Sequence, residues 1–155
     1  MQIIFTTYLT DSQKESAYNL WNNEYPQNLQ YKHITEFDAY LNGLSEKKHY
    51  LLINEQDIIA AWALTFIRNA EKWFAVIINS EIHGKGYGTM ILDKIKKDET
   101  QLSGWVIDHE RDAKANGRKY HSPLSFYKKN HFDILPDCRL ESETISAVKI
   151  VWKKV

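Results

Sequence analysis

The chain has 155 residues, the size of one domain, and its 20 Lys plus Arg balance its 20 Asp plus Glu at a formal net charge of zero. This balance argues against a dedicated nucleic-acid-binding protein, which usually carries a basic excess. Cys138 is the only cysteine, so no intrachain disulfide can form. The first residues lack a signal-peptide pattern and no apolar run approaches 18 residues. We therefore expect one cytoplasmic domain over residues 1–155, without membrane or nucleic-acid partners.

The first third of the chain predicts one strand and two helices. Residues 1–8 are rich in isoleucine and threonine, which favour extended structure. Asp11 or Ser12 is expected to cap a helix, and Pro26 is expected to end it because proline breaks a helix interior. Thr35 is expected to cap a second helix, in which apolar residues recur on one face.

The rest of the chain alternates between apolar runs and polar breaks. The continuous apolar run over residues 73–78 predicts a strand buried on both faces. Ser103 and Gly104 are expected to end the preceding helix, and Ser122 with Pro123 to begin a short one. The other expected elements, in chain order, are a hairpin of strands over 49–53 and 58–67, a helix from residue 87, a strand over 105–107, a loop over 111–120, a helix over 124–129, a strand over 132–135, a turn at Pro136 and Asp137, and a final strand over 147–155.

A glycine-rich turn lies between the central strand and the helix from residue 87. Gly84, Gly86 and Gly88 fall within five residues, and Lys85 lies among them. The first N–H groups of a helix have no intrahelical partner, and the helix dipole is positive there. Glycine also lets the backbone approach a phosphate closely. The order of strand, glycine-rich turn and helix therefore predicts an anion-binding loop.

Two common phosphate-binding loops fit this turn poorly. A Walker loop needs G-x-x-x-x-G-K-[ST], and Lys85 followed by Gly86 has neither that spacing nor that order. A Rossmann loop needs G-x-G-x-x-G, but Thr89 stands where the third glycine belongs. Asp108 does lie roughly 20 residues downstream, as that motif requires, yet too little chain follows to complete a dinucleotide domain. A small NAD-binding protein is thus disfavoured.

A third kind of loop fits better. Residues 83–88, His-Gly-Lys-Gly-Tyr-Gly, resemble the [QR]-x-x-G-x-[GA] signature of the GCN5-related N-acetyltransferase (GNAT) superfamily, which binds acetyl-coenzyme A (acetyl-CoA). The departure is His83, where the family usually has Gln or Arg. A neutral histidine lacks the permanent charge that arginine would place near the pyrophosphate.

A second segment supports the same family. Residues 122–132 are similar to the family's F-Y-x-K-x-G-F segment, with matches at Phe126, Tyr127, Lys129 and Phe132. His131 replaces the glycine, so it would be strained if that glycine needs a positive φ. The order β-α-α-β-β-β-α-β-α-β-β is also the family's order. The resemblance covers nearly the whole chain and implies an α/β (α+β) acyl-CoA N-acyltransferase fold: a mixed, mostly antiparallel twisted sheet flanked by helices, with a splayed central strand pair.

The resemblance also implies where acetyl-CoA, the cosubstrate, would bind. The pantetheine arm is expected to pair with main-chain groups near Ile77 and Ile78. The pyrophosphate is expected on the glycine-rich loop. The loop residues implied are His83, Gly84, Lys85, Gly86, Tyr87, Gly88 and Thr89. Tyr127 matches the tyrosine that commonly protonates the departing thiolate.

The general base and the acceptor site are less sharply indicated. Glu71, near the start of the central strand, and Asp108, after the adjacent strand, are the candidate bases, and ordered water is the alternative. Tyr25, Tyr31 and His109 are expected to contact the acceptor amine. No pair among the six histidines has a convincing metal-ligand spacing, so no metal is expected.

These features together predict an enzyme. We expect it to move an acetyl group from acetyl-CoA to a primary amine of a small molecule or peptide, by direct attack in a ternary complex. We expect a monomer or homodimer, and the sequence does not identify the acceptor. The alternative is a catalytically degenerate sensor or scaffold that binds acetyl-CoA without turnover, because His83 and His131 depart from the family pattern.

Overall fold

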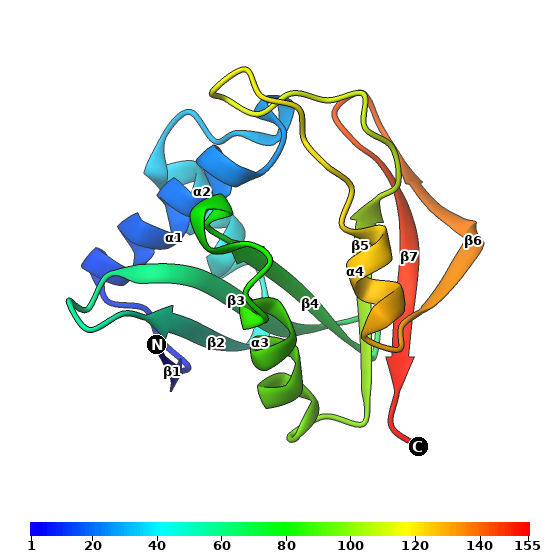
Figure 1. Cartoon of the computed structure of the whole chain (residues 1–155), viewed down its shortest axis with the longest axis horizontal. Coiled ribbons are helices and arrows are strands. Elements are labelled where there is room, and N and C mark those ends of the chain that lie inside the picture. Colours follow the sequence, from blue (N-terminus) through cyan, green and yellow to red (C-terminus); the bar gives the residue numbers. More distant parts are fainter.

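Seven strands form one sheet with helices on both faces (Figure 1). The computed structural model describes every residue from Met1 to Val155. The strand order is β1-β2-β3-β4-β5-β7-β6, and only the β4–β5 pair is parallel. The strands are β1 (Gln2–Thr6), β2 (Ser45–Ile53), β3 (Ile59–Arg68), β4 (Glu71–Ile78), β5 (Gln101–Ile107), β6 (Asp133–Glu141) and β7 (Ser146–Lys153). The helices are α1 (Asp11–Glu24), α2 (Ile34–Asn42), α3 (Tyr87–Lys96) and α4 (Leu124–Lys129), with short 3-10 helices η1 (Gln27–Leu29) and η2 (Ser80–Ile82).

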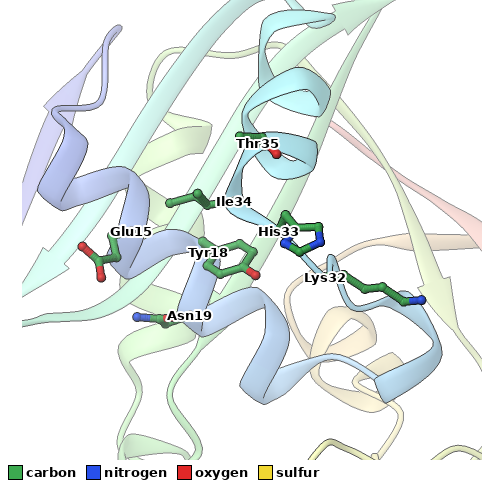
Figure 2. A pocket seen from close by; sticks show the side chains of 7 residues that line it. All are labelled: Glu15, Tyr18, Asn19, Lys32, His33, Ile34 and Thr35. Carbon is green, nitrogen blue, oxygen red and sulfur yellow. The ribbon is translucent and has the colours of Figure 1, made fainter.

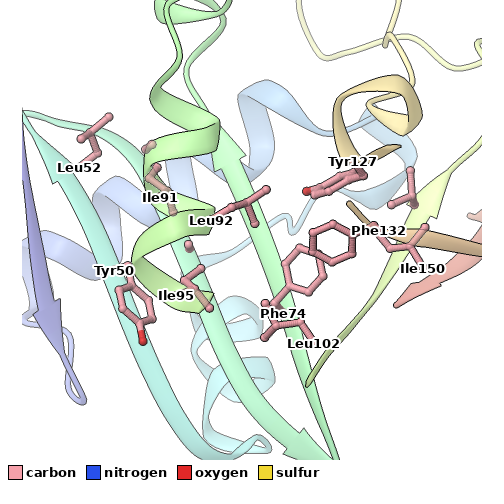
Figure 3. Close-up of a cluster of buried hydrophobic side chains, with 13 residues drawn as sticks. Tyr50, Leu52, Phe74, Ile91, Leu92, Ile95, Leu102, Tyr127, Phe132 and Ile150 are labelled. Carbon is pink, nitrogen blue, oxygen red and sulfur yellow. The ribbon is translucent and has the colours of Figure 1, made fainter. Parts of the chain in front are cut away.

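Alternating side chains of the central strands pack into two separate hydrophobic cores. On β3, Ala61 and Ala63 belong to the core beneath α3 and α4, which Figure 3 shows from close by. Trp62 and Leu64 belong to the core beneath α1 and α2 on the opposite face. This alternation is the period-2 pattern of a strand buried on both faces, and the small alanines let α3 lie close to the sheet. The expected element order and the mixed sheet flanked by helices are confirmed.

Both N-terminal helices begin one or two residues earlier than the sequence pattern suggested. The cap of α1 is Thr10, whose Oγ1 accepts a hydrogen bond from the Gln13 N–H at 3.1 Å. The Gln13 side chain in turn accepts from the Thr10 N–H at 2.9 Å, which completes a capping box. Asp11 therefore lies inside the first turn. Likewise, α2 begins at Ile34 after His33, so Thr35 is a helical residue rather than the cap.

Two predicted breaks proved to lie within strands. Ser103 and Gly104 belong to β5 and do not end α3. A Cβ atom on Gly104 would lie 2.7 Å from the Phe74 ring, so this glycine permits a close approach between strands rather than a helix end. The expected turn at Pro136 is a bulge in β6, where the register against β7 shifts between Leu135 and Arg139. None of the helices combines the length and apolar character that crossing a membrane requires.

His49 is a titratable side chain inside the core beneath α1 and α2. It lies on β2 with only 2% of its surface exposed. Its Nδ1 accepts a hydrogen bond from the Trp62 indole N–H at 3.1 Å, which requires the neutral imidazole tautomer with its proton on Nε2. Burial, helped by the charge of Lys47, lowers the pKa of His49 to about 4. The unfolded chain therefore takes up this proton at a higher pH than the folded one.

We expect acid to destabilise the fold through His49. Because the folded-state pKa is depressed, the contribution is complete above the unfolded pKa of about 6.5 and is lost as the pH falls towards 4. Urea unfolding should show a loss of about 2 kcal/mol between pH 8 and pH 5 that is absent in His49→Gln, whose amide can still accept from Trp62. The exposed His121→Gln variant is the control. An identical pH dependence in wild type and His49→Gln would contradict this assignment.

Candidate functional site

The central strands β4 and β5 start together and then separate. A single bridge joins them, between Trp73 and Ser103. Beyond it the two strands diverge, as Figure 1 shows. The Asn79 N–H donates to the Ala60 carbonyl of the neighbouring strand at 2.9 Å, and Ile77 is opposite Trp62. Since backbone groups alternate in direction along a strand, the odd-numbered residues of β4 pair with β3 and the even-numbered residues face β5.

The edge of β4 towards β5 therefore carries unpaired main-chain groups. Val76 and Ile78 face this edge beyond the last bridge to β5. No bridge to β5 follows the one at Trp73, and the Ile78 carbonyl has the Nε2 of His83 as a partner at 2.9 Å. Ile77, which the sequence suggested for this role, is paired with β3 instead. Exposed strand edges of this kind bind extended ligands through main-chain hydrogen bonds.

The glycine-rich loop continues from the end of β4 to the start of α3. Gly84 and Gly86 adopt positive φ of 75° and 84°, and Gly86 is the N-cap of α3 without any side-chain cap. The first N–H of this region to be bonded within the chain is that of Met90, which donates to the Gly86 carbonyl at 3.1 Å. The six N–H groups of residues 84–89 thus have no acceptor in the protein. Together with the helix dipole, they form a site suited to an anion.

The polar side chains of the loop differ in their surroundings. His83 is tied to the Ile78 carbonyl, so it fixes the loop against the end of β4 when its Nε2 carries a proton. Lys85 and Thr89 are exposed, whereas Tyr87 is half-buried and packs on the core beneath α3. Lys85 makes no ion pair, so its charge is free to face a bound anion.

Gly88 lets α3 pack closely against its neighbours. A Cβ atom at this position would lie 2.7 Å from the Phe126 ring on α4 and 3.1 Å from Ile78 on β4. Contacts below 3 Å do not occur between real side chains without displacement. Gly88 therefore holds together the loop, the β4 edge and α4.

Tyr127 lies beside this contact with its hydroxyl free. The side chain is 6% exposed, and its ring packs edge-on to those of Phe74, Phe126 and Phe132, with centroids 5.1 to 5.7 Å apart. In Figure 3 the hydroxyl points away from α4, towards β4 and α3. Burial, with the neighbouring Tyr120, raises the pKa of Tyr127 well above its usual range. The phenol is therefore protonated and able to donate at neutral pH.

Two further tyrosines, Tyr25 and Tyr120, also have raised pKa values. Tyr25 follows the end of α1, and its ring packs against Trp21 at 4.7 Å. Burial, then the hydroxyls of Tyr120 and Tyr127, raise the pKa of Tyr25 well above 10. Burial likewise raises the pKa of Tyr120, which no sequence motif singles out because it lies in a charged segment.

Tyr120 is the last residue of a hairpin over residues 112–120. Its arms pair at Ala113 and Lys119, and it docks on the end of α1, where the Gln27 N–H donates to the Ala113 carbonyl at 2.9 Å. Figure 1 shows this hairpin arching from β5 over to η1. The sequence had indicated only a loop here.

The docking contact includes a partly buried ion pair. The Lys114 ammonium lies 3.1 Å from Oε1 of Glu24, and both side chains are 12% exposed. The second carboxylate oxygen of Glu24 accepts from the Ser80 N–H at 3.1 Å, just beyond β4. Glu24 therefore links the hairpin, α1 and the end of β4. No local sequence pattern predicts this role.

Glu71 lies at the opposite end of β4 from the loop. Along a strand, its distance from Ile78 is about 20 Å. Its carboxylate accepts from Lys149 at 2.9 Å and from the Ser103 hydroxyl at 2.8 Å. These hydrogen bonds lower the pKa of Glu71, so it is a weak base and lies away from the other expected site residues.

Asp108 and His109 lie at the end of β5 but are engaged elsewhere. Arg139 holds the Asp108 carboxylate with two hydrogen bonds of 2.9 and 3.0 Å, and these lower the pKa of Asp108. The Nδ1 of His109 accepts from the Arg111 N–H at 3.1 Å, and Nε2 lies 3.8 Å from Asp112. With this bond to Nδ1, a neutral His109 carries its proton on Nε2.

Tyr31 belongs to an aromatic cluster on the α1–α2 side. Its ring lies 5.3 to 6.0 Å from those of Trp21, Phe37 and Tyr40, and burial raises its pKa to about 12. A shallow groove of about 610 Å³ lies on the outer side of the same helices, and Figure 2 shows the side chains that line it. The groove is lined by Glu15, Tyr18, Asn19, Lys32, His33, Ile34 and Thr35. Neither Tyr31 nor this groove adjoins the β4 edge.

The position of His131 bears out one expectation about the second motif. Its φ is 68°, the left-handed conformation that glycine adopts without strain. No group of three or more His, Cys, Asp or Glu side chains is arranged to hold a metal ion.

Comparison with solved structures identifies the fold. The chain is similar to aminoglycoside 6'-N-acetyltransferase complexed with coenzyme A, with a TM-score of 0.74 and 12% identity over 99% of this chain and 97% of that one. It is similar to a GNAT superfamily phosphinothricin acetyltransferase from Sinorhizobium meliloti in complex with AcCoA (TM-score 0.68, 10% identity, 99% and 89% covered). It is also similar to the ribosomal-protein-S18-alanine N-acetyltransferase from Escherichia coli (TM-score 0.61, 12% identity, 98% and 94% covered). No protein-family model and no curated protein matches the sequence. The chain has the GNAT fold, as the two motifs had indicated.

The contact at Gly88 leads to a prediction about stability. Replacing Gly88 with Val should lower the free energy of unfolding by about 1–3 kcal/mol, because the new side chain overlaps the Phe126 ring. Urea denaturation measures this loss, and Met90→Val, at an exposed position of the same helix, controls for helix propensity. Adding Phe126→Ala to Gly88→Val should recover part of the loss if the two side chains collide. Equal losses at positions 88 and 90 would contradict the proposed contact.

Proposed function

We propose that the chain is an N-acetyltransferase that binds acetyl-CoA and transfers its acetyl group to a primary amine of a small molecule or peptide. The observation that carries this proposal is the run of six unpaired N–H groups over residues 84–89, placed next to the unpaired edge of β4 in a GNAT fold. An anion site next to a free strand edge suits a ligand that has a pyrophosphate at one end and an amide-containing arm at the other.

Each part of the cosubstrate has a place in this arrangement. The pyrophosphate would lie on the N–H groups of residues 84–89, with Lys85 adding positive charge. The pantetheine arm would extend along β4 and pair with Val76 and Ile78. A main-chain N–H of this edge would stabilise the oxyanion that forms on the thioester carbonyl, so the reaction needs no particular side chain for that purpose.

The chemical step would use Tyr127 as the acid. The nitrogen lone pair of the amine attacks the thioester carbonyl carbon, the carbon–sulfur bond breaks, and the thiolate takes a proton from the Tyr127 hydroxyl. The amine nitrogen loses its extra proton to water, and Tyr127 is reprotonated from solvent. The raised pKa of Tyr127 keeps it in the acid form that this role requires.

Deprotonation of the amine would rely on water rather than on an expected carboxylate. Glu71 is bonded to Lys149, and Asp108 is bonded to Arg139, and both have lowered pKa values. Taking up a proton would break these ion pairs, so neither carboxylate is a good base near neutral pH. Proximity of the two bound reactants would supply much of the rate.

The binding step can be tested at Gly86. Gly86→Val forces a β-branched residue into a positive φ of 84° at the anion site and should lower CoA affinity at least about tenfold in calorimetric titration. Gly117→Val is a matched control, because Gly117 has a φ of 83° with equally open surroundings but lies at the tip of the hairpin. It should suffer similar strain and keep its CoA affinity. Equal affinity in both variants would refute the loop assignment.

The chemical step can be tested at Tyr127. Tyr127→Phe keeps the ring packing and should leave CoA affinity unchanged while lowering turnover roughly 10²-fold, the usual scale of general-acid catalysis. Release of free thiol from acetyl-CoA against a panel of primary amines measures turnover, and Tyr8→Phe, at a fully accessible tyrosine, is the control. Full turnover in Tyr127→Phe would exclude the acid role. Acetyl-CoA binding without thiol release for any amine would instead favour a sensor or scaffold.

A further inference from the structure

The His83 side chain lies at the junction between the two parts of the candidate site. Its Nε2 is 2.9 Å from the Ile78 carbonyl at the end of β4, and this is the only hydrogen bond of the ring. The next residue, Gly84, begins the run of N–H groups without an acceptor in the protein. One imidazole therefore borders both the unpaired edge of β4 and the anion site.

The Ile78 carbonyl, which this imidazole holds, faces the unpaired edge of β4. Ile78 is opposite Ala61 of β3. One residue further on, the Asn79 N–H donates to the Ala60 carbonyl at 2.9 Å. In an antiparallel ladder this register turns both main-chain groups of Ile78 away from β3 and towards the side of β5. Since no bridge to β5 reaches this far, His83 occupies an acceptor that an extended ligand along β4 would use.

The backbone before His83 is held by several contacts, so its ring is the part that can move. The Ser80 N–H donates to Glu24 at 3.1 Å, and the Ile82 side chain packs on the core beneath α3. The His83 N–H donates to the Ser80 carbonyl at 3.3 Å and closes η2. His83 itself is exposed. A change of its χ1 rotamer carries Nε2 away from the strand edge and leaves these backbone bonds intact.

The charges along the chain around His83 favour an anion beside the ring. Lys85 makes no ion pair, and Glu24 is already paired with Lys114 at 3.1 Å. Glu81, two residues before the ring, is exposed, so solvent screens its charge. A ring with its proton on Nε2 can donate this proton to one acceptor at a time. A phosphate oxygen is charged, so it is a stronger acceptor than a main-chain carbonyl.

We propose that the His83 imidazole exchanges partners when acetyl-CoA binds. An amide N–H of the pantetheine arm takes over the Ile78 carbonyl, and the released Nε2–H of His83 donates to a pyrophosphate oxygen. The carbonyl and the imidazole then each have a partner both with and without the cosubstrate, so neither is left unsatisfied by the exchange. This inference rests on the proposed function and states how the two halves of that cosubstrate site are coupled.

The exchange makes the two halves of the cosubstrate cooperate. The arm alone must break the bond between His83 and Ile78 without giving the ring a new acceptor. The phosphates alone gain the ring only if the same bond is broken. When both halves are present, the ring leaves the carbonyl and gains the phosphate. Each half should therefore strengthen the binding of the other by the same factor.

Two fragments of the cosubstrate test this coupling. Pantetheine carries the arm, and 3'-phosphoadenosine 5'-diphosphate carries the phosphates; each is titrated into the isotope-labelled whole protein and followed by amide chemical shifts. Saturating nucleotide should raise the pantetheine affinity of the wild type roughly fivefold, the scale of one hydrogen bond. In His83→Ala, pantetheine alone should bind about fivefold more tightly than to the wild type, because no bond has to be broken. The nucleotide should no longer change that affinity.

A second histidine provides the matched control. His121 is exposed and its ring also makes a single contact, with Glu110 at 3.3 Å, so His121→Ala should behave as the wild type. Parallel loss of both fragments in His83→Ala would mean that the bond to Ile78 only holds the loop in shape. Unchanged affinities would mean that the bond has no part in binding. Either result would overturn the exchange.

The bond itself can be observed without any ligand. The carbonyl carbon resonance of Ile78 should move upfield in His83→Ala, because the carbonyl loses its donor. Bound CoA should remove most of this difference, since the arm then supplies the donor in both proteins. An identical Ile78 resonance in the free wild type and variant would overturn the proposal. A wild type that binds no CoA would contradict the proposed function and the exchange with it, whereas CoA binding without coupling of the fragments would contradict the exchange alone.

Discussion

The parallel contact between β4 and β5 is limited to one bridge, and the candidate site depends on that limit. A fully paired β4 would have no free main-chain groups, because its other edge is already bonded to β3 along its length. Aromatic side chains of β4 pack against β5 on both faces next to this bridge. Trp73 stacks on Trp105 with ring centroids 5.4 Å apart, while the Phe74 ring fills the space that a side chain at Gly104 would need. The strands are thus joined by side-chain packing where hydrogen bonds are absent.

The same packing places the reactive groups relative to that edge. Phe74 contacts both Tyr127 and Phe132, so the position of α4 follows the position of β4. Gly88 brings the start of α3 against α4 from the other side. The position of the Tyr127 ring relative to the glycine-rich loop is therefore set by close-packed side chains on rigid elements.

Three carboxylates around the central strands are held by basic side chains. The carboxylates that a sequence-based search selects as bases, Glu71 and Asp108, are each bonded to a basic side chain. Glu24 is likewise paired with Lys114 and stabilises the hairpin. Beyond the end of β4, the free N–H groups of the glycine-rich loop lie beside Lys85, which makes no ion pair. Free N–H groups at a helix N-terminus, with a positive charge nearby, favour a bound anion.

Local sequence signals are sufficient to predict the order of strands and helices and the position of the glycine-rich loop. Local signals are sufficient for both: apolar runs fix the strands, and closely spaced glycines before a helix, such as Gly84 and Gly86, indicate free N–H groups whatever the surroundings. The same local signals failed where long-range packing gives a residue its role. From the sequence, Gly104 resembles a helix end. In the structure it leaves room for the Phe74 ring of β4.

Which residues meet near the end of β4 depends on contacts between distant parts of the chain. Glu24 and Lys114 are 90 residues apart in the chain, and neither lies in a motif. Tyr120 ends a hairpin in a charged segment that the sequence predicts as a loop, and the hairpin pairs with Pro26 and Gln27, just after α1. Conversely, Glu71 fits a base by sequence position, but the fold pairs it with Lys149 far from the loop. Which side chains pair with Glu24 and Glu71 depends on how elements far apart in the chain are arranged in space. No local pattern of residues predicts that arrangement.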